Sequence, residues 1–297
     1  MQTITPPFLK RGDVIGLVAP ARKISPEELE PALQMLRSWG LGIRIGKNMF
    51  GSDNQFSGTD EQRTADFQDL LDDQEVKAVL SVRGGYGTLR IIDRLDFSRF
   101  KRSPKWIIGY SDVTVLHSHI HNLGIETLHA TMPSKFAGSP ASVESLRMAL
   151  FGEKLKHTWQ GEIFGRQGAV EAPLVGGNLS LLYALQGSRS DLNTKGKILF
   201  LEDLDEYLYH IDRMILSLKR SGKLDHLAGL VIGGMTEMKD NTIPFGNSAE
   251  EIILEAVKEY DYPVAFSLPA GHTDLNLALM MGRNVKLEAG PLNSLEF

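Results

Sequence analysis

The 297-residue chain contains no cysteine, which excludes disulfides, thiolate nucleophiles and cysteine-ligated zinc or iron–sulfur centres. It has no excess of positive charge either. Its net charge of −5 argues against broad nucleic-acid binding, which needs a basic surface. No apolar run approaches the roughly 18 residues of a membrane span, and the first residues lack the pattern of a signal peptide. We therefore expect a soluble, cytoplasmic protein that binds neither nucleic acid nor membrane and whose covalent chemistry uses an oxygen or an amine.

Hydrophobic residues make up 42% of the chain and charged residues 23%, the balance of a globular protein with an ample core. The length allows one large domain or two ordinary ones, at about 100–200 residues per domain. Between residues 137 and 167 glycines interrupt the apolar spacing that helices and strands require. We predict only one short helix there, near residues 142–150. The sequence thus predicts an N-terminal domain at 1–136, a linker at 137–167 and a second domain at 168–297.

The first 130 residues alternate strand-like and helix-like segments at the spacing of βα units. Buried strands are predicted at residues 14–19, 41–45, 76–82 and 106–109. Capping signatures predict helices after Ser25 and Thr59, although Pro31 suggests that the first helix starts later than Ser25. Sequential strands with helical crossovers indicate a doubly wound parallel sheet. The second half has shorter strands and more glycine turns, which predicts a smaller mixed α/β domain.

Ser111 directly follows the fourth predicted strand. Ligands of open α/β sheets bind at the carboxyl ends of the strands. A serine on a sharp strand-to-helix turn exposes its hydroxyl, and the next backbone N–H can face a developing oxyanion. The usual Gly-x-Ser-x-Gly pattern is incomplete, because Val113 stands in place of the second glycine. Taken alone, the motif is more typical of a helix N-cap than of a nucleophile.

The third predicted strand runs into residues 83–87, with the sequence Arg-Gly-Gly-Tyr-Gly. Glycines let a backbone approach a ligand closely and present N–H groups to an anion. An alternative interpretation is a phosphate or dinucleotide loop. The Gly-x-Gly-x-x-Gly spacing is absent, however, and the first strand ends without glycines. The segment therefore favours an anion-binding backbone over a nucleotide site.

A serine nucleophile needs a base, and the base needs an orienting acid. His272 lies on a glycine turn just past a predicted strand at 264–267, a loop suited to aiming a side chain. Glu202 follows the apolar strand at 197–201, where a carboxylate leaves the core, and Asp203 is the second candidate for the acid. These residues predict a base and an acid far apart in the sequence.

His117 and His121 share one face of a predicted helix, at a spacing that a metal pair could use. No set of acidic ligands accompanies them. We therefore predict solvated helix positions for these histidines and no metal site.

Short motifs spread over nearly the whole chain carry a family resemblance. Each is unspecific alone, whereas the ordered set is specific. They lie at residues 12–15 with 19–20, 56–60 with Arg63, 83–87, 108–114, 176–179, 200–203 with 211–214, and 269–272. In this order they resemble the LD-carboxypeptidase family of serine peptidases, the muramoyltetrapeptide carboxypeptidases.

The resemblance implies a catalytic triad of Ser111, Glu202 and His272. It places the oxyanion hole at the backbone N–H groups of Gly85 and Asp112. The implied activity is metal-free hydrolysis of an L,D-peptide bond, without a cofactor, that releases terminal D-alanine from murein tetrapeptides in cell-wall recycling. The implied fold is an N-terminal domain similar to class I glutamine amidotransferases with a smaller C-terminal α/β domain, commonly as a homodimer.

Arg83, Tyr86 and Asn178 are weaker candidates for binding the substrate. The sequence departs from the family pattern at Ala21 and Arg22, beside the first strand end, and at Ala130, and these positions bear on how the substrate is bound. One alternative is a microcin C self-immunity type of peptidase, which cleaves acyl-adenylate-like amides under an aromatic loop. The predicted linker offers only Trp159 for such stacking. A further alternative is a non-catalytic ligand-binding module that kept the cleft.

Overall fold

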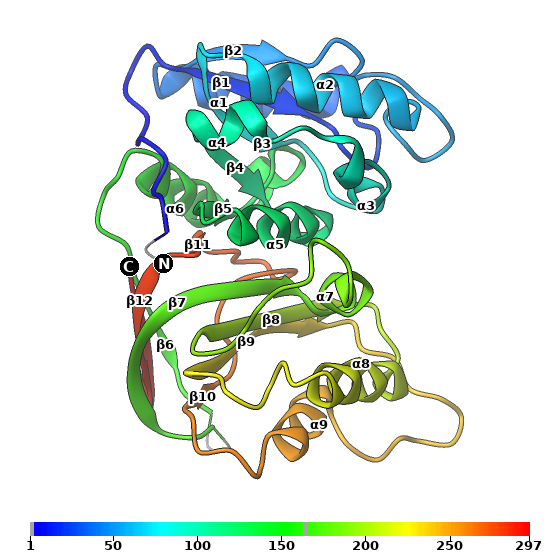
Figure 1. Ribbon diagram of the computed structural model, residues 1–297, viewed down its shortest axis with the longest axis vertical. Helices are drawn as coiled ribbons and strands as arrows, with labels where there is room; N and C mark the ends of the chain where they lie inside the picture. The colour runs from blue at the N-terminus through cyan, green and yellow to red at the C-terminus, as the bar shows by residue number, and fades with distance from the viewer. Residues whose placement is uncertain (1–2, 163–164) are drawn as a thin grey trace.

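The computed structural model describes residues 3–162 and 165–297. In these two ranges the strands form a six-stranded and a seven-stranded sheet. Each sheet belongs to one of two lobes that lie one above the other in Figure 1. The predicted mixed α/β architecture with a parallel sheet is confirmed. None of the described helices is long and apolar enough to cross a bilayer.

The sheet of the first lobe has the order β11-β5-β4-β3-β1-β2. Its strands are β1 (Val14–Val18), β2 (Gly42–Ile45), β3 (Val76–Ser81), β4 (Trp106–Gly109), β5 (Thr127–His129) and β11 (Leu279–Met281). β1 to β5 run parallel, and β11 pairs with β5 in the antiparallel direction. A segment of the second half of the chain therefore completes the first sheet.

Helices cover both faces of the first sheet, because neighbouring strand residues face opposite sides. One face packs on α1 (Pro26–Ser38) and α6 (Pro140–Leu150), and the other on α2 (Asp60–Asp72), α4 (Ser98–Arg102) and α5 (Thr114–Asn122). Capping boxes at Ser25 and Thr59 begin α1 and α2, as predicted. The later start expected from Pro31 is wrong. Helix α1 contains Pro31, because the capping box holds the first turn in place ahead of it.

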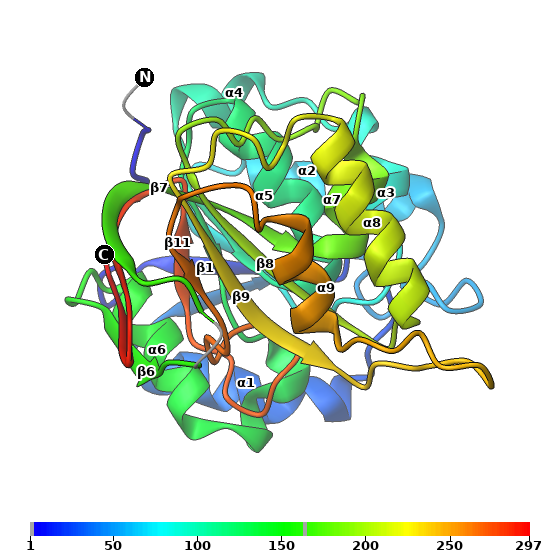
Figure 2. The ribbon, with the colours of Figure 1, turned by 90° about the horizontal axis from the view of Figure 1, so that it is seen from below.

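The sheet of the second lobe has the order β10-β9-β8-β7-β12-β13-β6. Its strands are β6 (Lys156–Gln160), β7 (Gly168–Asn178), β8 (Ile198–Leu204), β9 (Gly229–Thr236), β10 (Val264–Ala265), β12 (Asn284–Ala289) and β13 (Leu292–Glu296). Strands β7 to β10 run parallel, and β12, β13 and β6 add an antiparallel extension. Helices α7 (Leu179–Leu185), α8 (Leu208–Arg220) and α9 (Ala249–Ala256) cover one face and lie to the right of β8 and β9 in Figure 2.

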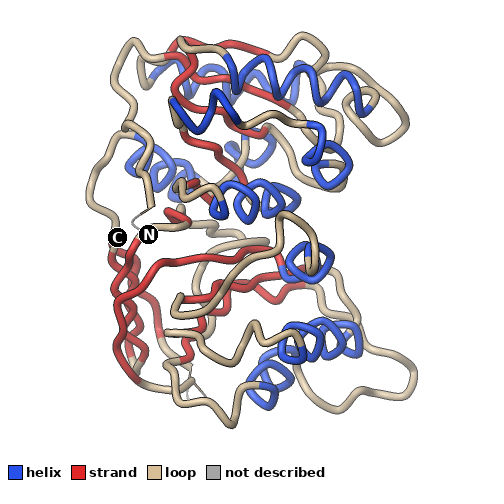
Figure 3. The backbone as a smooth tube through the Cα atoms, in the orientation of Figure 1, coloured by secondary structure: helices blue, strands red, loops and turns tan. Residues whose placement is uncertain are grey.

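The remaining short helices sit mostly at strand ends of the first lobe, whose helices and strands are joined by the tan loops of Figure 3. They are α3 (Thr88–Ile91), η1 (Ile92–Arg94), η2 (Ser111–Val113) and η3 (Pro133–Gly138). The segment predicted as a linker, 137–167, carries α6 and the edge strand β6, while residues 163 and 164 lie outside the described residues. The domain limits 1–136 and 168–297 stay a prediction.

Candidate active site

Ser111 lies on a tight turn between β4 and α5. Its φ of +63° is in the left-handed region, a conformation that costs a non-glycine residue roughly 1–3 kcal/mol and that surrounding structure must hold. The side chain caps no helix, since η2 has no side-chain cap bond. Its Oγ lies 3.1 Å from Nε2 of His272 instead. The N-cap interpretation of Ser111 is therefore wrong, because the turn points the hydroxyl across to the second lobe.

His272 is held by the fully buried carboxylate of Glu202. The imidazole Nδ1 lies 2.7 Å from Oε2 of Glu202, and the backbone N–H of His272 donates to the same oxygen at 3.1 Å. With Nδ1 donating to the carboxylate, the neutral ring presents an unprotonated Nε2 to the Ser111 hydroxyl. Gly271, at a φ of +96°, permits this approach, because a Cβ there would lie 2.5 Å from Oε2 of Glu202. The three side chains thus form one hydrogen-bonded chain.

Asp203, the second candidate for the acid, points away from His272. Its Oδ1 accepts from Nδ2 of Asn178 and its Oδ2 from the backbone N–H of Ser180, both at 2.9 Å. Burial, followed by the negative charge of Glu202, raises the pKa of Asp203 to about 7. Of the two neighbouring acids, Glu202 is the one in contact with the imidazole.

The surroundings of His272 favour its charged form. Burial alone lowers the pKa of His272, but the hydrogen bond and charge of Glu202, together with the charge of Asp203, outweigh it and raise this pKa above the usual 6.5. The ring of Tyr110 packs against the imidazole with 5.0 Å between the ring centroids. Burial and the charge of Glu202 raise the pKa of Tyr110 to about 12, so its hydroxyl stays protonated at neutral pH.

The glycine loop at residues 83–87 lies against the serine. A Cβ on Gly84 would stand 3.1 Å from Oγ of Ser111, so a side chain there would crowd the hydroxyl. Asp112 holds the loop in place, because its buried Oδ2 accepts a hydrogen bond from the backbone N–H of Thr88 at 2.7 Å. Arg63, also buried, donates to the carbonyl oxygen of Gly87 at 3.0 Å. The oxyanion role of Gly85 and Asp112 stays a prediction.

Strand β11 ties the loop that carries His272 to the lobe that carries Ser111. Leu279 pairs with His129 in β5, and His129 pairs with Gly109 at the end of β4, just before the serine turn. The backbone N–H of Asn276 donates to Oγ of Ser142 in α6 at 2.9 Å. The spacing of His272 and Ser111 is therefore set by sheet pairing within the first lobe as well as by contacts between the lobes.

Two adjoining cavities meet at His272, which lines both. The nucleophile cavity, of about 710 Å³, is lined by Ser111, His272 and the predicted binding residues Arg83, Tyr86 and Asn178. The flanking cavity, of about 590 Å³, also borders His272 and is lined by Thr131, Ser139, Ser142, Thr236, Thr273 and Asn276 among others. Tyr110, Lys135 and Leu204 line both cavities. The two cavities together could hold a peptide that extends to both sides of the bond next to Ser111 and His272.

The three predicted binding residues differ in how free they are. Arg83 forms an ion pair with Glu28 at 3.1 Å. Asn178 is buried, and its side chain begins α7 while its amide donates to Asp203. Tyr86 is 44% exposed, so its ring is available to a ligand. Their binding roles stay predictions. Sequence reasoning had no signal for Lys135, which only the tertiary structure brings to the site.

The predicted solvation of His117 is wrong. Its ring is buried, with Nδ1 2.7 Å from Oγ1 of Thr127 and Nε2 2.9 Å from the carbonyl oxygen of Gly109. Burial lowers the pKa of His117 to about 4, so the ring is neutral. Through its contact with Gly109, His117 supports the end of β4, next to the turn that carries Ser111. Among the described residues, no three histidine, aspartate or glutamate side chains gather as metal ligands.

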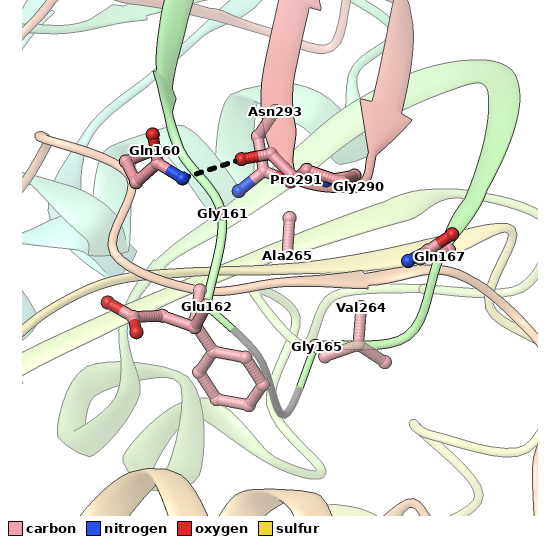
Figure 4. A pocket seen from close by; sticks show the side chains of 11 residues that line it. Gln160, Gly161, Glu162, Gly165, Gln167, Val264, Ala265, Gly290, Pro291 and Asn293 are labelled. Carbon is pink, nitrogen blue, oxygen red and sulfur yellow. Dashed lines mark hydrogen bonds between the residues drawn. The ribbon is translucent and has the colours of Figure 1, made fainter.

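A separate pocket of about 280 Å³ lies in the second lobe, between the end of β6, strand β10 and the turn that joins β12 to β13 (Figure 4). Gln160 and Asn293 border it, and the side-chain amide of Gln160 donates to the carbonyl oxygen of Pro291 at 2.9 Å. None of the described residues that line it is a serine or a histidine. It therefore lacks the groups for acyl transfer that the Ser111 site brings together.

Comparison with known proteins places the chain in a family. Residues 15–130 match the model of the LD-carboxypeptidase N-terminal domain, and residues 171–287 match that of the LD-carboxypeptidase C-terminal domain. A probable murein peptide carboxypeptidase of Bacillus subtilis is 38% identical over 93% of this chain and 89% of its own length. The murein tetrapeptide carboxypeptidase of Pseudomonas aeruginosa is 30% identical over 94% of both chains.

Solved structures agree with these matches. The muramoyltetrapeptide carboxypeptidase from Oxalobacter formigenes superposes with a TM-score of 0.87 at 26% identity, over 95% of this chain and 98% of its own. The microcin C7 self immunity protein MccF, in complex with aspartyl sulfamoyl adenosine, has the same fold, with a TM-score of 0.86 at 22% identity over 97% of both chains. With both domain models matched in order along most of its length, the chain belongs to the LD-carboxypeptidase family of peptidases.

Proposed function

We propose that this protein is a serine carboxypeptidase that hydrolyses an L,D-peptide bond and releases terminal D-alanine from murein tetrapeptides. The observation that carries this proposal is the hydrogen-bonded chain from Ser111 through His272 to Glu202 at the meeting point of two cavities. The names of the relatives in Bacillus subtilis and Pseudomonas aeruginosa support the murein peptide as substrate.

Acylation follows from the geometry. Nε2 of His272 removes the Ser111 proton while Oγ attacks the scissile carbonyl carbon. Glu202 holds the ring in the tautomer that accepts this proton and stabilises the imidazolium that forms. The carbonyl oxygen, now an oxyanion, turns toward the backbone N–H groups of Gly85 and Asp112. His272 then protonates the amine of D-alanine, and the C–N bond breaks.

Deacylation repeats these roles with water as the nucleophile. His272 takes a proton from water, the hydroxide attacks the Ser111 ester, and the ester oxygen recovers its proton from the imidazolium. No step in this scheme uses a metal ion. We therefore expect full activity in the presence of a chelator such as EDTA, and a loss that added divalent ions restore would contradict the scheme.

The burial of Trp159 counts against a microcin-type substrate. Trp159 lies within β6, is 7% exposed, and donates its indole N–H to the carbonyl oxygen of Phe266 at 2.7 Å. It therefore packs in the second lobe and does not line the Ser111 cavities. The likeness to the microcin C7 immunity protein is one of fold. A non-catalytic binding module is disfavoured by the close contact of all three triad side chains.

The cellular setting belongs to the same proposal. The family resemblance implies a cytoplasmic enzyme of cell-wall recycling that forms a homodimer. Light scattering coupled to size-exclusion chromatography tests the dimer by its mass.

D-Alanine release tests the proposed function. Purified protein is incubated with free murein tetrapeptide, and D-alanine is quantified against a matched Ser111→Ala protein. We expect release by the wild-type protein and release at least about 10⁴-fold slower by the variant. The same rate in both proteins would contradict the serine mechanism, and no release by the wild-type protein would contradict the substrate.

A further inference from the structure

The direction in which a peptide crosses the site follows from the protonation step. His272 must hand its proton to the nitrogen of the leaving residue, so that nitrogen lies next to Nε2. The acyl part of the substrate then extends the opposite way, past Ser111. Because the two cavities meet at His272, the acyl part occupies the nucleophile cavity and the leaving residue points into the flanking cavity.

The leaving residue of a carboxypeptidase substrate carries a free carboxylate, two covalent bonds from its nitrogen. A charged group of this kind needs a cation or N–H donors when it leaves water. The binding group must therefore stand near His272, at the junction of the two cavities. A cation deeper in the nucleophile cavity would face the acyl part instead.

Three cationic side chains line the cavities. Arg83 is already paired with Glu28 at 3.1 Å. Arg22 lies over Gly85, with its Cδ 2.5 Å from the place a Cβ would take there, and lines only the nucleophile cavity. Lys135 lines both cavities. Among the described residues, Lys135 makes no ion pair and no side-chain hydrogen bond, so its ammonium group is free for a ligand.

The electrostatics around His272 agree with this placement. The positive charge of Lys135 lowers the pKa of His272, against the stronger effects of Glu202 and Asp203 that raise it. Lys135 is thus near enough for its charge to act on the base. The flanking cavity also holds the acidic side chains of Glu237 and Asp274, which repel a carboxylate and favour its placement at the lysine end.

We propose that Lys135 binds the terminal carboxylate of the leaving residue and so restricts the enzyme to cleavage at a free C-terminus. This inference rests on the proposed function. It assigns the flanking cavity to the departing D-amino acid and the nucleophile cavity to the rest of the peptide. The ammonium group acts as a point charge that one carboxylate satisfies.

A matched pair of substrates tests the role of Lys135. The pair is murein tetrapeptide with its free terminal carboxylate and the same peptide ending in a carboxamide. For the wild-type protein we expect kcat/KM to favour the carboxylate by about 10- to 100-fold, the range of one charge-assisted hydrogen bond. In Lys135→Met the preference falls to within about threefold, because only the charged substrate loses a partner. Lys101→Met, which removes an exposed lysine on α4, keeps the preference.

Two results would overturn the proposal. One is a Lys135→Met protein that loses activity equally on both peptides. The other is collapse of the preference in Arg22→Met and not in Lys135→Met, which would move the carboxylate into the nucleophile cavity. The pH profile adds a readout that a structural role would not move. Loss of the lysine charge raises the pKa of His272, so the acidic limb of kcat/KM for the amide peptide shifts to higher pH.

Binding separates this inference from the proposed function. In the Ser111→Ala background, calorimetric titration of both peptides measures the preference for the carboxylate without turnover. A preference that depends on Lys135 supports the inference even where the wild-type protein releases no D-alanine, in which case only the proposed function fails. A preference that Lys135→Met leaves intact overturns the inference even where D-alanine is released.

Discussion

The two lobes build their parts of the site in different ways. In the first lobe, Ser111 and the glycine loop follow β4 and β3, neighbouring strands of one parallel sheet, so ordinary strand order brings them together. In the second lobe, Glu202 and His272 come from segments separated by 70 residues and meet through one carboxylate oxygen. The nucleophile is thus placed by local backbone, and the base by tertiary contacts.

This difference predicts where each lobe is sensitive to substitution. Around Ser111 the backbone is already strained and braced, so removing the hydroxyl costs chemistry and little stability. Around His272 the geometry depends on a glycine, on a buried carboxylate and on the pairing of β11 with β5. Substitutions there should displace His272, and the fall in rate should be larger where the contact that is lost is stronger.

Ser111→Ala has the largest expected effect. It removes the nucleophile, so kcat for D-alanine release should fall by about 10⁴- to 10⁶-fold. The thermal unfolding midpoint should stay close to that of the wild type, because the turn and its braces remain. Steady-state kinetics and a thermal melt measure both. A large fall in the melting midpoint would show that the Ser111 hydroxyl supports the fold. That result would contradict the claim that its removal costs activity and little stability.

Glu202→Gln should follow, with kcat lower by about 10³- to 10⁴-fold, because the amide no longer favours the tautomer that accepts the proton. Loss of the charge also lowers the pKa of His272, which Glu202 holds above its usual value. A base must be neutral to act, so the acidic limb of the pH–rate profile lies above pH 6.5 in the wild type and moves to lower pH in the variant.

Asp203→Asn is the matched control for Glu202→Gln. Its carboxylate contacts Asn178 and Ser180 and does not contact the imidazole. We expect a loss of activity at least about tenfold smaller than that of Glu202→Gln. Equal losses in the two variants, with unchanged pH profiles, would mean that the acid is misassigned.

Gly271→Ala tests how the base is held. The new Cβ would meet Oε2 of Glu202 at 2.5 Å, so the loop must move and kcat should fall by about 10- to 100-fold. Gly187→Ala is the control. Gly187 also has a positive φ, of +76°, but nothing lies within 4 Å of its Cβ position. It should cost about 1–2 kcal/mol in stability and leave the rate unchanged. Similar rates in the two variants would remove the role assigned to Gly271.

Ser142→Ala has the smallest expected effect. It leaves the buried N–H of Asn276 without its acceptor, which costs about 1–3 kcal/mol and loosens the loop that carries His272. The expected fall in kcat is a few-fold, measured together with the unfolding free energy. Ser38→Ala, which removes an exposed hydroxyl bonded within α1, serves as the reference. If Ser142→Ala matches this reference in both measurements, the anchoring of the base from the first lobe is not supported.

Local signals in the sequence predicted much of the first lobe. The capping box of Ser25 needs only residues three apart, and α1 starts where it predicts. The strand before Ser111 is a continuous apolar run, and the strand before the glycine loop is apolar except for Lys77 and Ser81, a composition typical of a buried parallel sheet. Sequence reasoning therefore succeeded for these elements, whose structure depends on nearby residues.

Features set by distant contacts could not be predicted from the sequence. Strand β11 has three residues and no pattern of its own, and its place depends on pairing with β5, about 150 positions away. The choice between Glu202 and Asp203 depends on which side of β8 faces the loop of His272, and the register shift between Leu201 and Asp203 disturbs the usual alternation. Lys135 lies in η3 after β5, and its place beside the Ser111 cavity depends on how this turn packs against the first sheet.

The most direct test of the central claim is to trap the acyl-enzyme. The protein is mixed with murein tetrapeptide, quenched in acid within milliseconds to seconds, digested, and examined by mass spectrometry. We expect an adduct equal to the peptide minus D-alanine, bound as an ester on the fragment containing Ser111. His272→Ala should show no such adduct on this time scale. An adduct on another side chain, or one that forms equally fast without His272, would rule out acylation of Ser111 with His272 as the base.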